Sequence, residues 1–397
     1  HYRKILLEKY EARLASLGIS ECPIAYRQVV KDPNSQSGKC NIDFAKDAFD
    51  EVKMLGNCVA VALDIKGYFD TLDHGMIKEL WLELLDLDRL PKDHFSVFKN
   101  ITEYKFVDQK DVYRRLGYLE KQKDGKYEVE RFTIPYSEMP KQLCSSRDFR
   151  EKICGGDPSL ASLVQRNSNK FGIPQGAPIS DLIANFYLMH FDKAVFEYVK
   201  ARGGRYMRYS DDILLILPGG ISEAQSARKF VSDEVKNYGE QLEIKDTKTC
   251  IVQFMRSSGE LEFKHIEGPQ GKNGLEYLGF CFDGKNVRIR NSTISRFYRK
   301  VAIAARKEAF RHKKNSGLTD VQDLLDSFNF SLLSQRFTRV KRTAFLIDDV
   351  RTWTFWTYLR RAAKAFGDDG QEILKQASGY RSFVRQRVER AIIDALG

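Results

Sequence analysis

Two adjacent carboxylates stand between apolar segments in the middle of the sequence. Asp211 and Asp212 follow residues 206–209 and precede the apolar run 213–217. A third carboxylate, Asp64, ends another apolar run. These runs are typical of buried strands, and strands lying side by side would bring the three carboxylates to one edge of a sheet. An ordinary hairpin turn is the alternative for the Asp-Asp pair, because Asp favours turns.

Three carboxylates at one sheet edge repel one another unless cations lie between them. Oxygen ligands without neighbouring His or Cys suit Mg²⁺, with Mn²⁺ as the alternative, better than Zn²⁺. Two such ions a few ångströms apart can activate an attacking hydroxyl and stabilise a leaving pyrophosphate during an in-line displacement. The carboxylates therefore suit a two-metal nucleotidyl-transfer centre, but the Asp-Asp pair alone supports an ordinary hairpin turn equally well.

Further motifs occur in a fixed order along the chain. They are DIKGYFDTLDH from Asp64, GIPQGAPIS at 172–180, YSDD at 209–212, LEIKDTKT at 242–249 and LEYLGF at 275–280. In this order and spacing they resemble the reverse transcriptase family across roughly residues 20–285. The resemblance implies an α+β fold, a right-hand polymerase with fingers and palm built from an antiparallel sheet plus helices. An all-helical C-terminal thumb would follow.

The resemblance also implies catalytic roles. Asp64, Asp211 and Asp212 would be the catalytic carboxylates and would bind the metals together with the carbonyl of Ile65. Lys248 matches the lysine that protonates the leaving pyrophosphate, and a surface lysine is the alternative interpretation of that residue.

The incoming nucleotide would meet a second set of residues. Phe69, five residues after Asp64, matches the steric gate that excludes a ribose 2′-OH, with a core aromatic as the alternative. Pro174, Gln175 and Gly176 resemble the loop that holds the nucleotide and its template base: Pro stiffens a turn, Gly permits close approach, and the Gln amide both donates and accepts. Arg27 is the first candidate for the triphosphate, because a guanidinium binds phosphate in a bidentate manner.

The primer end would rest on the LEYLGF segment. Tyr277, Leu278 and Gly279 match the primer grip, although Leu278 also suits a simple core position. Ser180 is predicted to be the N-cap of the helix that follows it, rather than a ligand.

The net charge of +11 is concentrated near the C-terminus. Residues 285–345 contain 15 Lys and Arg against 4 Asp and Glu, with aromatic side chains interleaved. This composition indicates a partner with a phosphate backbone. The candidate nucleic-acid-binding residues are Arg296, Arg299, Lys300, Arg306, Arg339, Lys341 and Arg342.

Helices and strands that would position these residues follow from hydrophobic periodicity. Residues 1–285 are predicted to form fingers and palm, with an insertion at about 90–170, and residues 286–397 a basic helical thumb. Helices are expected over residues 1–20, 73–90, 181–202 and 222–238, and throughout from about 290. Strands are expected over residues 58–64, 205–217 with a turn inside, 242–255, 260–266 and 276–282.

Composition excludes several classes of protein. No apolar run approaches the roughly 20 residues that cross a bilayer, so no membrane partner is expected. The charged N-terminal segment does not resemble a signal peptide. Seven scattered cysteines without a Cys-x-x-Cys pair indicate reduced thiols and a cytoplasmic protein. The oligomeric state is left open.

The predicted function is RNA-directed DNA polymerase, using dNTPs, an RNA template and a DNA product. GKCNIDFAKDAFDEVK at 38–53, CVAVALDIKGYFDTLDH at 58–74 and the long spacer between Asp64 and Gly172 resemble the bacterial defence-associated reverse transcriptases. That subgroup would imply a structured noncoding RNA as dedicated template, in antiphage defence. The alternatives are a template-independent or protein-primed DNA polymerase of abortive-infection type, a retron-like reverse transcriptase, an RNA-dependent RNA polymerase, and a non-catalytic RNA-binding relative.

Overall fold

The computed structural model describes residues 1–31, 38–124, 127–338 and 354–396. The chain divides into two compact units, each assembled from separate stretches of sequence. The first unit comprises residues 1–16, 67–189 and 238–242. The second unit comprises residues 17–66, 190–237 and 243–397.

The first unit is mainly helical, and its core includes Trp81. The indole is fully buried, donates a hydrogen bond to His94 Nδ1 at 3.1 Å, and lies edge-on to Phe186. Small two-stranded sheets, β2 with β5 and β3 with β4, add to the helices. The elements are α1 (Tyr2–Leu17), α3 (Tyr68–Thr71), α4 (His74–Leu85), α5 (Lys92–Thr102), β2 (Lys105–Phe106), α6 (Gln109–Arg115), β3 (Leu119–Asp124), β4 (Tyr127–Phe132), η1 (Tyr136–Glu138), α7 (Ser146–Asp148), η2 (Phe149–Ile153), β5 (Gln165–Arg166) and α8 (Ser180–Tyr187).

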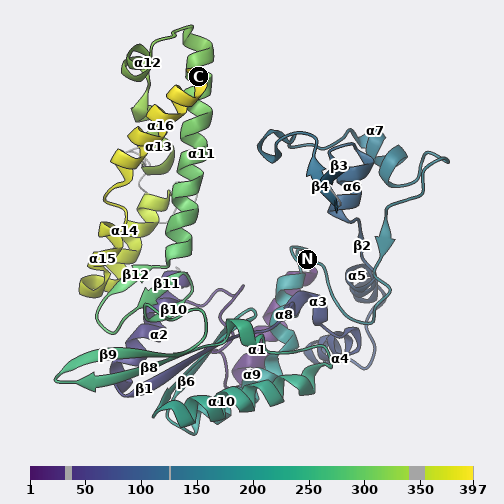
Figure 1. The fold of residues 1–397 in the computed structure, drawn as a ribbon. Helices are drawn as coiled ribbons and strands as arrows, with labels where there is room; N and C mark the ends of the chain where they lie inside the picture. The colour runs from purple at the N-terminus through teal and green to yellow at the C-terminus, as the bar shows by residue number, and fades with distance from the viewer. Residues whose placement is uncertain (32–37, 125–126, 339–353, 397) are drawn as a thin grey trace. The chain divides into compact units, whose positions relative to one another are not determined.

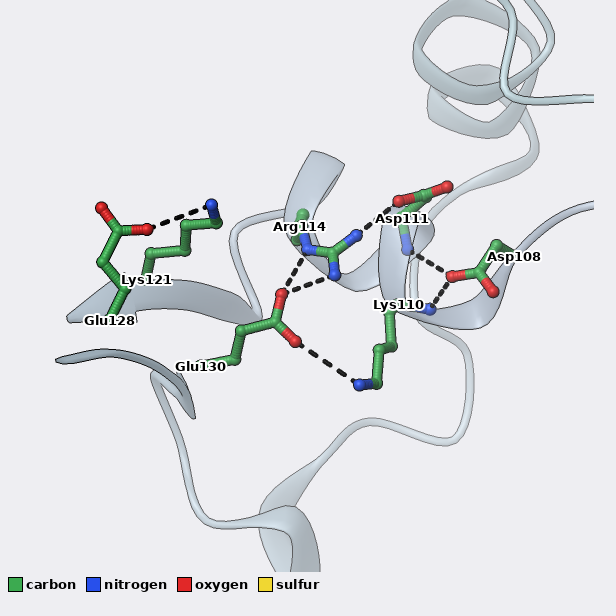
Figure 2. Close-up of polar contacts among 7 residues, drawn as sticks. All are labelled: Asp108, Lys110, Asp111, Arg114, Lys121, Glu128 and Glu130. Carbon is green, nitrogen blue, oxygen red and sulfur yellow. Dashed lines mark hydrogen bonds and ion pairs between the residues drawn. The ribbon is translucent and has the colours of Figure 1, made fainter.

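Exposed ion pairs join α6 to the β3–β4 hairpin (Figure 2). Glu130 on β4 accepts a hydrogen bond from Arg114 Nε at 2.7 Å and lies 3.5 Å from Lys110 Nζ. Asp108 begins the helix by accepting hydrogen bonds from the backbone N–H groups of Lys110 and Asp111. Exposed pairs of this kind contribute little stability individually. Their effect is to orient the helix on the hairpin within the predicted insertion.

The second unit is built on a five-stranded antiparallel sheet in the order β6-β7-β1-β8-β9 (Figure 1). Helix α2 covers one face of the sheet, and α10 contacts β1 and β7. A smaller sheet, β10-β11-β12, and C-terminal helices complete the unit. The elements are α2 (Asn41–Leu55), β1 (Cys58–Asp64), α9 (Met189–Lys200), β6 (Arg205–Tyr209), β7 (Asp212–Pro218), α10 (Ile221–Glu234), η3 (Val235–Tyr238), η4 (Asp246–Lys248), β8 (Cys250–Ser257), β9 (Glu260–Glu267), β10 (Leu275–Tyr277), β11 (Phe280–Phe282), β12 (Val287–Ile289), α11 (Asn291–Ser316), α12 (Val321–Ser327), α13 (Phe330–Thr338), α14 (Phe355–Phe366), η7 (Gly367–Gly370), α15 (Gln371–Lys375) and α16 (Tyr380–Leu396).

Two apolar cores hold the second unit together. In the first, alternate residues of the large sheet, such as Ala60, Leu214 and Val252, pack with α2 and with the small sheet. The second core lies between α11 and α16, where Val301 and Val388 are fully buried. Burial of this apolar surface is the main favourable term in folding of the unit.

The predicted α+β fold, with an antiparallel sheet and a helical C-terminal segment, is confirmed. Several boundaries were wrong. The helix expected over residues 181–202 is two helices, with Leu188 between α8 and α9. Strand β8 begins only at Cys250, because η4 precedes it. The strand expected over 276–282 is a hairpin of β10 and β11, and β12 precedes the C-terminal helices.

Ser180 was predicted to be an N-cap, but it is the first residue of α8, and Ile179 occupies the N-cap position. The helix therefore begins one residue earlier in the chain than predicted, after a turn in which Ser180 N–H donates to the Ala177 carbonyl. In the described part of the chain, no helix combines the length and apolar character that crossing a membrane requires.

Candidate active site

The three carboxylates meet at one end of the large sheet. Strands β1 and β7 pair antiparallel from Cys58 opposite Pro218 to Asp64 opposite Asp212. Directly paired residues project to the same face of a sheet, so these two carboxylates are neighbours. Asp211 lies in the turn between β6 and β7, and its carbonyl accepts a hydrogen bond from Ile65 N–H at 3.2 Å. The sequence-based expectation of strands side by side with their carboxylates at one edge is met.

The turn that carries Asp211 has strained backbone geometry. Tyr209 pairs with Asp212, which leaves Ser210 and Asp211 as a two-residue hairpin loop. Ser210 has φ of 60°, whereas Asp211 is not among the residues with positive φ. This combination is that of a type II′ turn, in which the first position normally requires glycine. A non-glycine residue there is a source of strain of the kind found at functional sites.

A buried arginine lies directly below this turn. Arg208 is fully buried, and its Nη1 donates a hydrogen bond to the Ser210 carbonyl at 3.0 Å. Its Nε and Nη2 donate to the two carboxylate oxygens of Asp192 on α9, each at 2.6 Å. Tyr206 donates its hydroxyl to the same carboxylate at 2.7 Å. The hairpin is therefore tied to the interior of the unit by a charged pair.

Neither Arg208 nor Asp192 was predicted as a site residue from the sequence. No clear signal marked them, because other charged residues stand in the same segments, Lys193 beside Asp192 and Arg205 near Arg208. Their burial shows the pairing, since buried charges need partners.

Burial, and then repulsion between neighbouring carboxylates, disfavours ionisation at this site. Loss of water around the carboxyl and the neighbouring charge of Asp64 raise the pKa of Asp211. Loss of water and the charges of Asp211 and Asp64 raise the pKa of Asp212 to about 6. The Asp212 side chain is nevertheless exposed at the sheet edge, so solvent screens part of this repulsion.

Lys248 offsets part of the negative charge. Its Nζ lies 2.6 Å from Asp64 Oδ2, and this hydrogen bond raises the pKa of the lysine. The short helix η4 carries Lys248, and the Lys245 N–H donates to the Asp64 carbonyl at 2.7 Å. The predicted catalytic lysine therefore contacts a predicted metal ligand. Lys248 is also exposed, as the alternative interpretation of a surface lysine expects, and its catalytic role stays a prediction.

The donor set fits divalent cations that prefer oxygen. Three carboxylates at one sheet edge gain stability from a nearby cation, and no sulfur or imidazole is needed. Among the residues that the structure describes, however, no group of three or more His, Cys, Asp or Glu side chains is already arranged around a common metal position. The Lys248 ammonium is the cation that contacts Asp64 here. The metal contact of the Ile65 carbonyl remains a prediction.

The predicted gate and nucleotide loop both lie in the first unit. Phe69 is half-buried, so it is not a core aromatic. Its carbonyl accepts a hydrogen bond from Ile173 N–H at 2.8 Å, which joins the gate segment to the start of the loop. Gln175 and Gly176 are exposed, and Gly176 has φ of 91°, a conformation that favours glycine. The structure thus brings Phe69 beside the loop that contains Pro174 and leaves Gln175 accessible.

Arg27 lies in the second unit and contacts its own loop. Its Nη1 donates to the carbonyl of Ser20 at 2.8 Å and also to that of Pro23. These contacts give the guanidinium a structural role, and triphosphate binding by Arg27 stays a prediction.

The predicted primer grip is a second tight hairpin. Tyr277 is buried and pairs with Phe280, so Leu278 and Gly279 form a two-residue loop. Both loop residues have positive φ, 45° and 92°, as in a type I′ turn. Asn41 Nδ2 donates to the Leu278 carbonyl at 3.2 Å. Leu278 is thus a turn residue rather than a simple core residue, and Asn41 was not predicted.

Helix α11 carries the described part of the basic surface. Four predicted residues, Arg296, Arg299, Lys300 and Arg306, are all exposed, and the helical period places them on one side of the helix. The Arg306 guanidinium lies 5.6 Å from the ring centre of the exposed Phe310. Three further predicted residues, Arg339, Lys341 and Arg342, lie outside the described residues.

The repulsion predicts a pH-dependent effect of Asp212→Asn on stability. A carboxyl whose pKa is raised on folding destabilises the native state as it ionises. For Asp212 this loss in the free energy of unfolding is absent below about pH 4 and complete above about pH 6. We expect the melting temperature of the variant in EDTA to match the wild type at pH 4 and to exceed it at pH 8. Thermal unfolding across this range, followed by circular dichroism, measures the difference.

Addition of Mg²⁺ at pH 8 should reduce that difference, because bound cations would relieve the repulsion in the wild type. A difference that does not change with pH would show that the Asp212 carboxyl is not under strain from its neighbours.

Comparison with known proteins agrees with this geometry. The family model described as reverse transcriptase (RNA-dependent DNA polymerase) matches residues 127–282, which contain the nucleotide loop, Asp211, Asp212, Lys248 and the hairpin at Leu278. Asp64 precedes the matched residues.

A telomerase reverse transcriptase of Oryzias latipes is 25% identical over 245 residues, which are 58% of this chain and 22% of that protein. The chain thus spans about a fifth of the length of this curated relative. Among solved structures, apo telomerase from Candida tropicalis has a TM-score of 0.41 at 14% identity, covering 99% of this chain and 53% of that chain. Telomerase from Candida albicans with the TWJ fragment of telomeric RNA has a TM-score of 0.40 at 12% identity, covering 99% and 54%.

Both telomerase structures have a TM-score under 0.5, so neither supports a conclusion about the function of this chain. The family match coincides instead with the segments whose geometry is described above. Residues 127–282 of this chain therefore resemble reverse transcriptases, over the stretch that the family model matches.

Proposed function

We propose that this chain is an RNA-directed DNA polymerase that adds dNTPs to a primer end on an RNA template. The observation that carries the proposal is the meeting of Asp64 with Asp211 and Asp212 at one sheet edge, in a chain whose residues 127–282 match reverse transcriptases. The function is nucleotidyl transfer because mutually repelling carboxylates without His or Cys are suited to oxygen-ligated dications.

In this proposal Asp64, Asp211 and Asp212, with the Ile65 carbonyl, hold two Mg²⁺ ions or, alternatively, Mn²⁺. Such ions, when bound, would activate the primer 3′-hydroxyl and stabilise the leaving pyrophosphate. The sheet register keeps the carboxylates in place despite their repulsion. The Lys248 ammonium, within hydrogen-bond distance of Asp64, carries the proton that the pyrophosphate takes up.

The remaining site residues select and orient the reactants. Phe69 excludes the ribose 2′-OH, the exposed Gln175 amide contacts the nucleotide and template base, and Arg27 remains the candidate for the triphosphate. The Leu278–Gly279 turn supports the primer end. The basic face of α11 binds the phosphate backbone of template and primer.

We also propose a more specific setting for the activity, a cytoplasmic enzyme with a dedicated structured noncoding RNA as template. The curated relative is named as a telomerase reverse transcriptase, which supports an RNA template for this chain. All seven cysteines are free thiols, in keeping with a reducing compartment. Antiphage defence rests on the resemblance of residues 38–53 and 58–74 to bacterial defence-associated enzymes.

The double variant Asp211→Ala with Asp212→Ala should lose DNA synthesis completely. Primer extension on an RNA template with dNTPs and Mg²⁺ should fall to the level of a no-enzyme control, because two of three carboxylates are gone. RNA binding should stay close to that of the wild type, and so should folding, because the change relieves repulsion. D323A/D326A, which removes two exposed carboxylates from α12, is the matched control and should retain synthesis.

Synthesis by D211A/D212A would refute the metal-site assignment. A wild type that binds RNA without extending a primer would be the non-catalytic relative, and extension without any template would identify a template-independent polymerase.

Sequencing the nucleic acid that co-purifies with both proteins tests whether the enzyme has a dedicated RNA. We expect one discrete RNA in both samples, with complementary DNA only in the wild type. Loss of protection against phage in D211A/D212A would extend the result to defence.

Phe69→Ala should admit ribonucleotides. Removal of the ring opens space for a 2′-OH, so the preference for dNTPs over rNTPs should fall by roughly tenfold or more. Single-nucleotide incorporation with each substrate measures the preference as a ratio of kcat/KM values. F95A removes another partly exposed phenylalanine of the first unit and should leave the ratio unchanged. An unchanged ratio in F69A would mean that Phe69 is not the gate.

Neutralising the α11 face should weaken RNA binding and reduce its salt dependence. The double variant R299Q/K300Q removes two exposed charges, and each phosphate that is no longer neutralised should lower the slope of log K against log salt by roughly 0.7–0.9. K229Q/K236Q removes two exposed charges from the region of α10 in the same unit and is the control. Equal slopes of log K against log salt for R299Q/K300Q and the control would mean that the α11 residues face solvent and do not contact RNA phosphates.

A further inference from the structure

We propose that Arg208 is a positioning residue that sets the direction of Asp211 by holding the peptide between Ser210 and Asp211. The inference rests on the proposed function, because it assigns Arg208 a role in the metal site of that function. The observation that motivates it is the hydrogen bond from Arg208 Nη1 to the Ser210 carbonyl at 3.0 Å.

This peptide is the variable part of a two-residue hairpin loop. Type I′ and type II′ turns share a positive φ at the first loop residue and differ in the orientation of the peptide that follows it. Ser210 has φ of 60°, and the negative φ of Asp211 places the loop in the second type. A peptide flip would redirect the Asp211 backbone and, with it, the carboxylate. The donor on the Ser210 oxygen therefore selects one direction for Asp211.

The donor itself is fixed by the interior of the unit. Both Asp192 carboxylate oxygens accept from the Arg208 guanidinium at 2.6 Å, and Arg208 and Asp192 are each fully buried. The Arg208 backbone pairs outside its hairpin as well: its N–H donates to Cys22 at 2.8 Å, and its carbonyl accepts from Ile24 at 2.9 Å. The planar fork of a guanidinium can bind Asp192 on one side and present a donor to the turn on the other.

A purely structural ion pair would have different consequences. Such a pair would stabilise the packing of α9 against β6, and its loss would weaken metal binding only as far as it weakens the fold. Tyr206 provides the comparison. Its hydroxyl donates to the same Asp192 carboxylate at 2.7 Å, but the hydrogen bond to the Ser210 carbonyl comes from Arg208. The positioning role predicts that Arg208 and Tyr206 differ in their effect on metal binding.

The test measures Mn²⁺ binding to the full chain by electron paramagnetic resonance, beside melting temperature and primer extension. R208M/D192L removes both members of the pair, so no buried charge is left without a partner. We expect its Mn²⁺ affinity to fall about ten- to hundredfold, the usual effect of losing an outer-shell partner, while circular dichroism still shows a folded chain. The magnesium concentration for half-maximal synthesis should rise in parallel.

Two single variants complete the test. Y206F should keep Mn²⁺ affinity close to that of the wild type, because the bond to the Ser210 carbonyl remains. R208K keeps the charge beside Asp192 but lacks the fork, so its Mn²⁺ affinity should lie between wild type and R208M/D192L. R208K also decides the question if R208M/D192L does not fold: wild-type affinity in folded R208K would then overturn the role.

Folded R208M/D192L with the Mn²⁺ affinity of the wild type would overturn the positioning role, and so would an equal loss in Y206F. A wild type that neither binds Mn²⁺ nor extends a primer would instead refute the proposed function. The two failures are therefore distinguishable from the wild-type measurement alone.

Discussion

The second unit depends on holding three carboxylates together at one end of a sheet against their mutual repulsion. Each raised pKa at Asp211 and Asp212 reflects an unfavourable term that the rest of the fold must offset. The offset comes from the paired strands β1 and β7, whose apolar residues are almost all buried. Both faces of these strands are buried, so a shift of register by one residue would exchange the side chains packed on each face and would also move Asp64 away from its position opposite Asp212.

The two tight turns of the second unit share one physical device. Each has a non-glycine residue in the left-handed region at its first position, Ser210 in one and Leu278 in the other. In each, a side chain from elsewhere in the chain, or from deeper in the hairpin, donates to the carbonyl of that residue: Arg208 for Ser210 and Asn41 for Leu278. A held carbonyl stabilises a strained peptide in one orientation. Both turns occupy positions that the reverse transcriptase resemblance assigns to the reaction, at the metal ligands and at the primer end.

Charge is divided between opposite tasks. A site made of three carboxylates repels the phosphate backbone of a nucleic acid. Among the described ion pairs, only Lys248 brings a positive charge to this site, through its contact with Asp64. The exposed cations of α11 supply the opposite field in the same unit, where Arg296, Arg299 and Lys300 share one side of the helix. Cations bound by the carboxylates and cations on the helix would together make binding of template and primer favourable.

The class of fold and the cluster of carboxylates could be predicted from the order of residues alone. Continuous apolar runs predicted the strands that end at Asp64 and begin at Asp212, and the motif order pointed to the family whose model matches residues 127–282. These features are local, because a strand, a turn and a motif are each defined by residues close together in the chain. Boundaries such as the break at Leu188 were missed, since periodicity changes little across a short interruption.

The distant residues that support the site became visible only in the folded chain. Asp192 and Arg208 lie on a helix and a strand, and nothing in either segment alone identifies the other as its partner. Asn41 and Leu278 are separated by more than half the chain, yet one holds the carbonyl of the other. The physical reason is that a buried charge or a strained peptide requires a partner without specifying where along the chain it lies. Packing of the whole unit selects that partner.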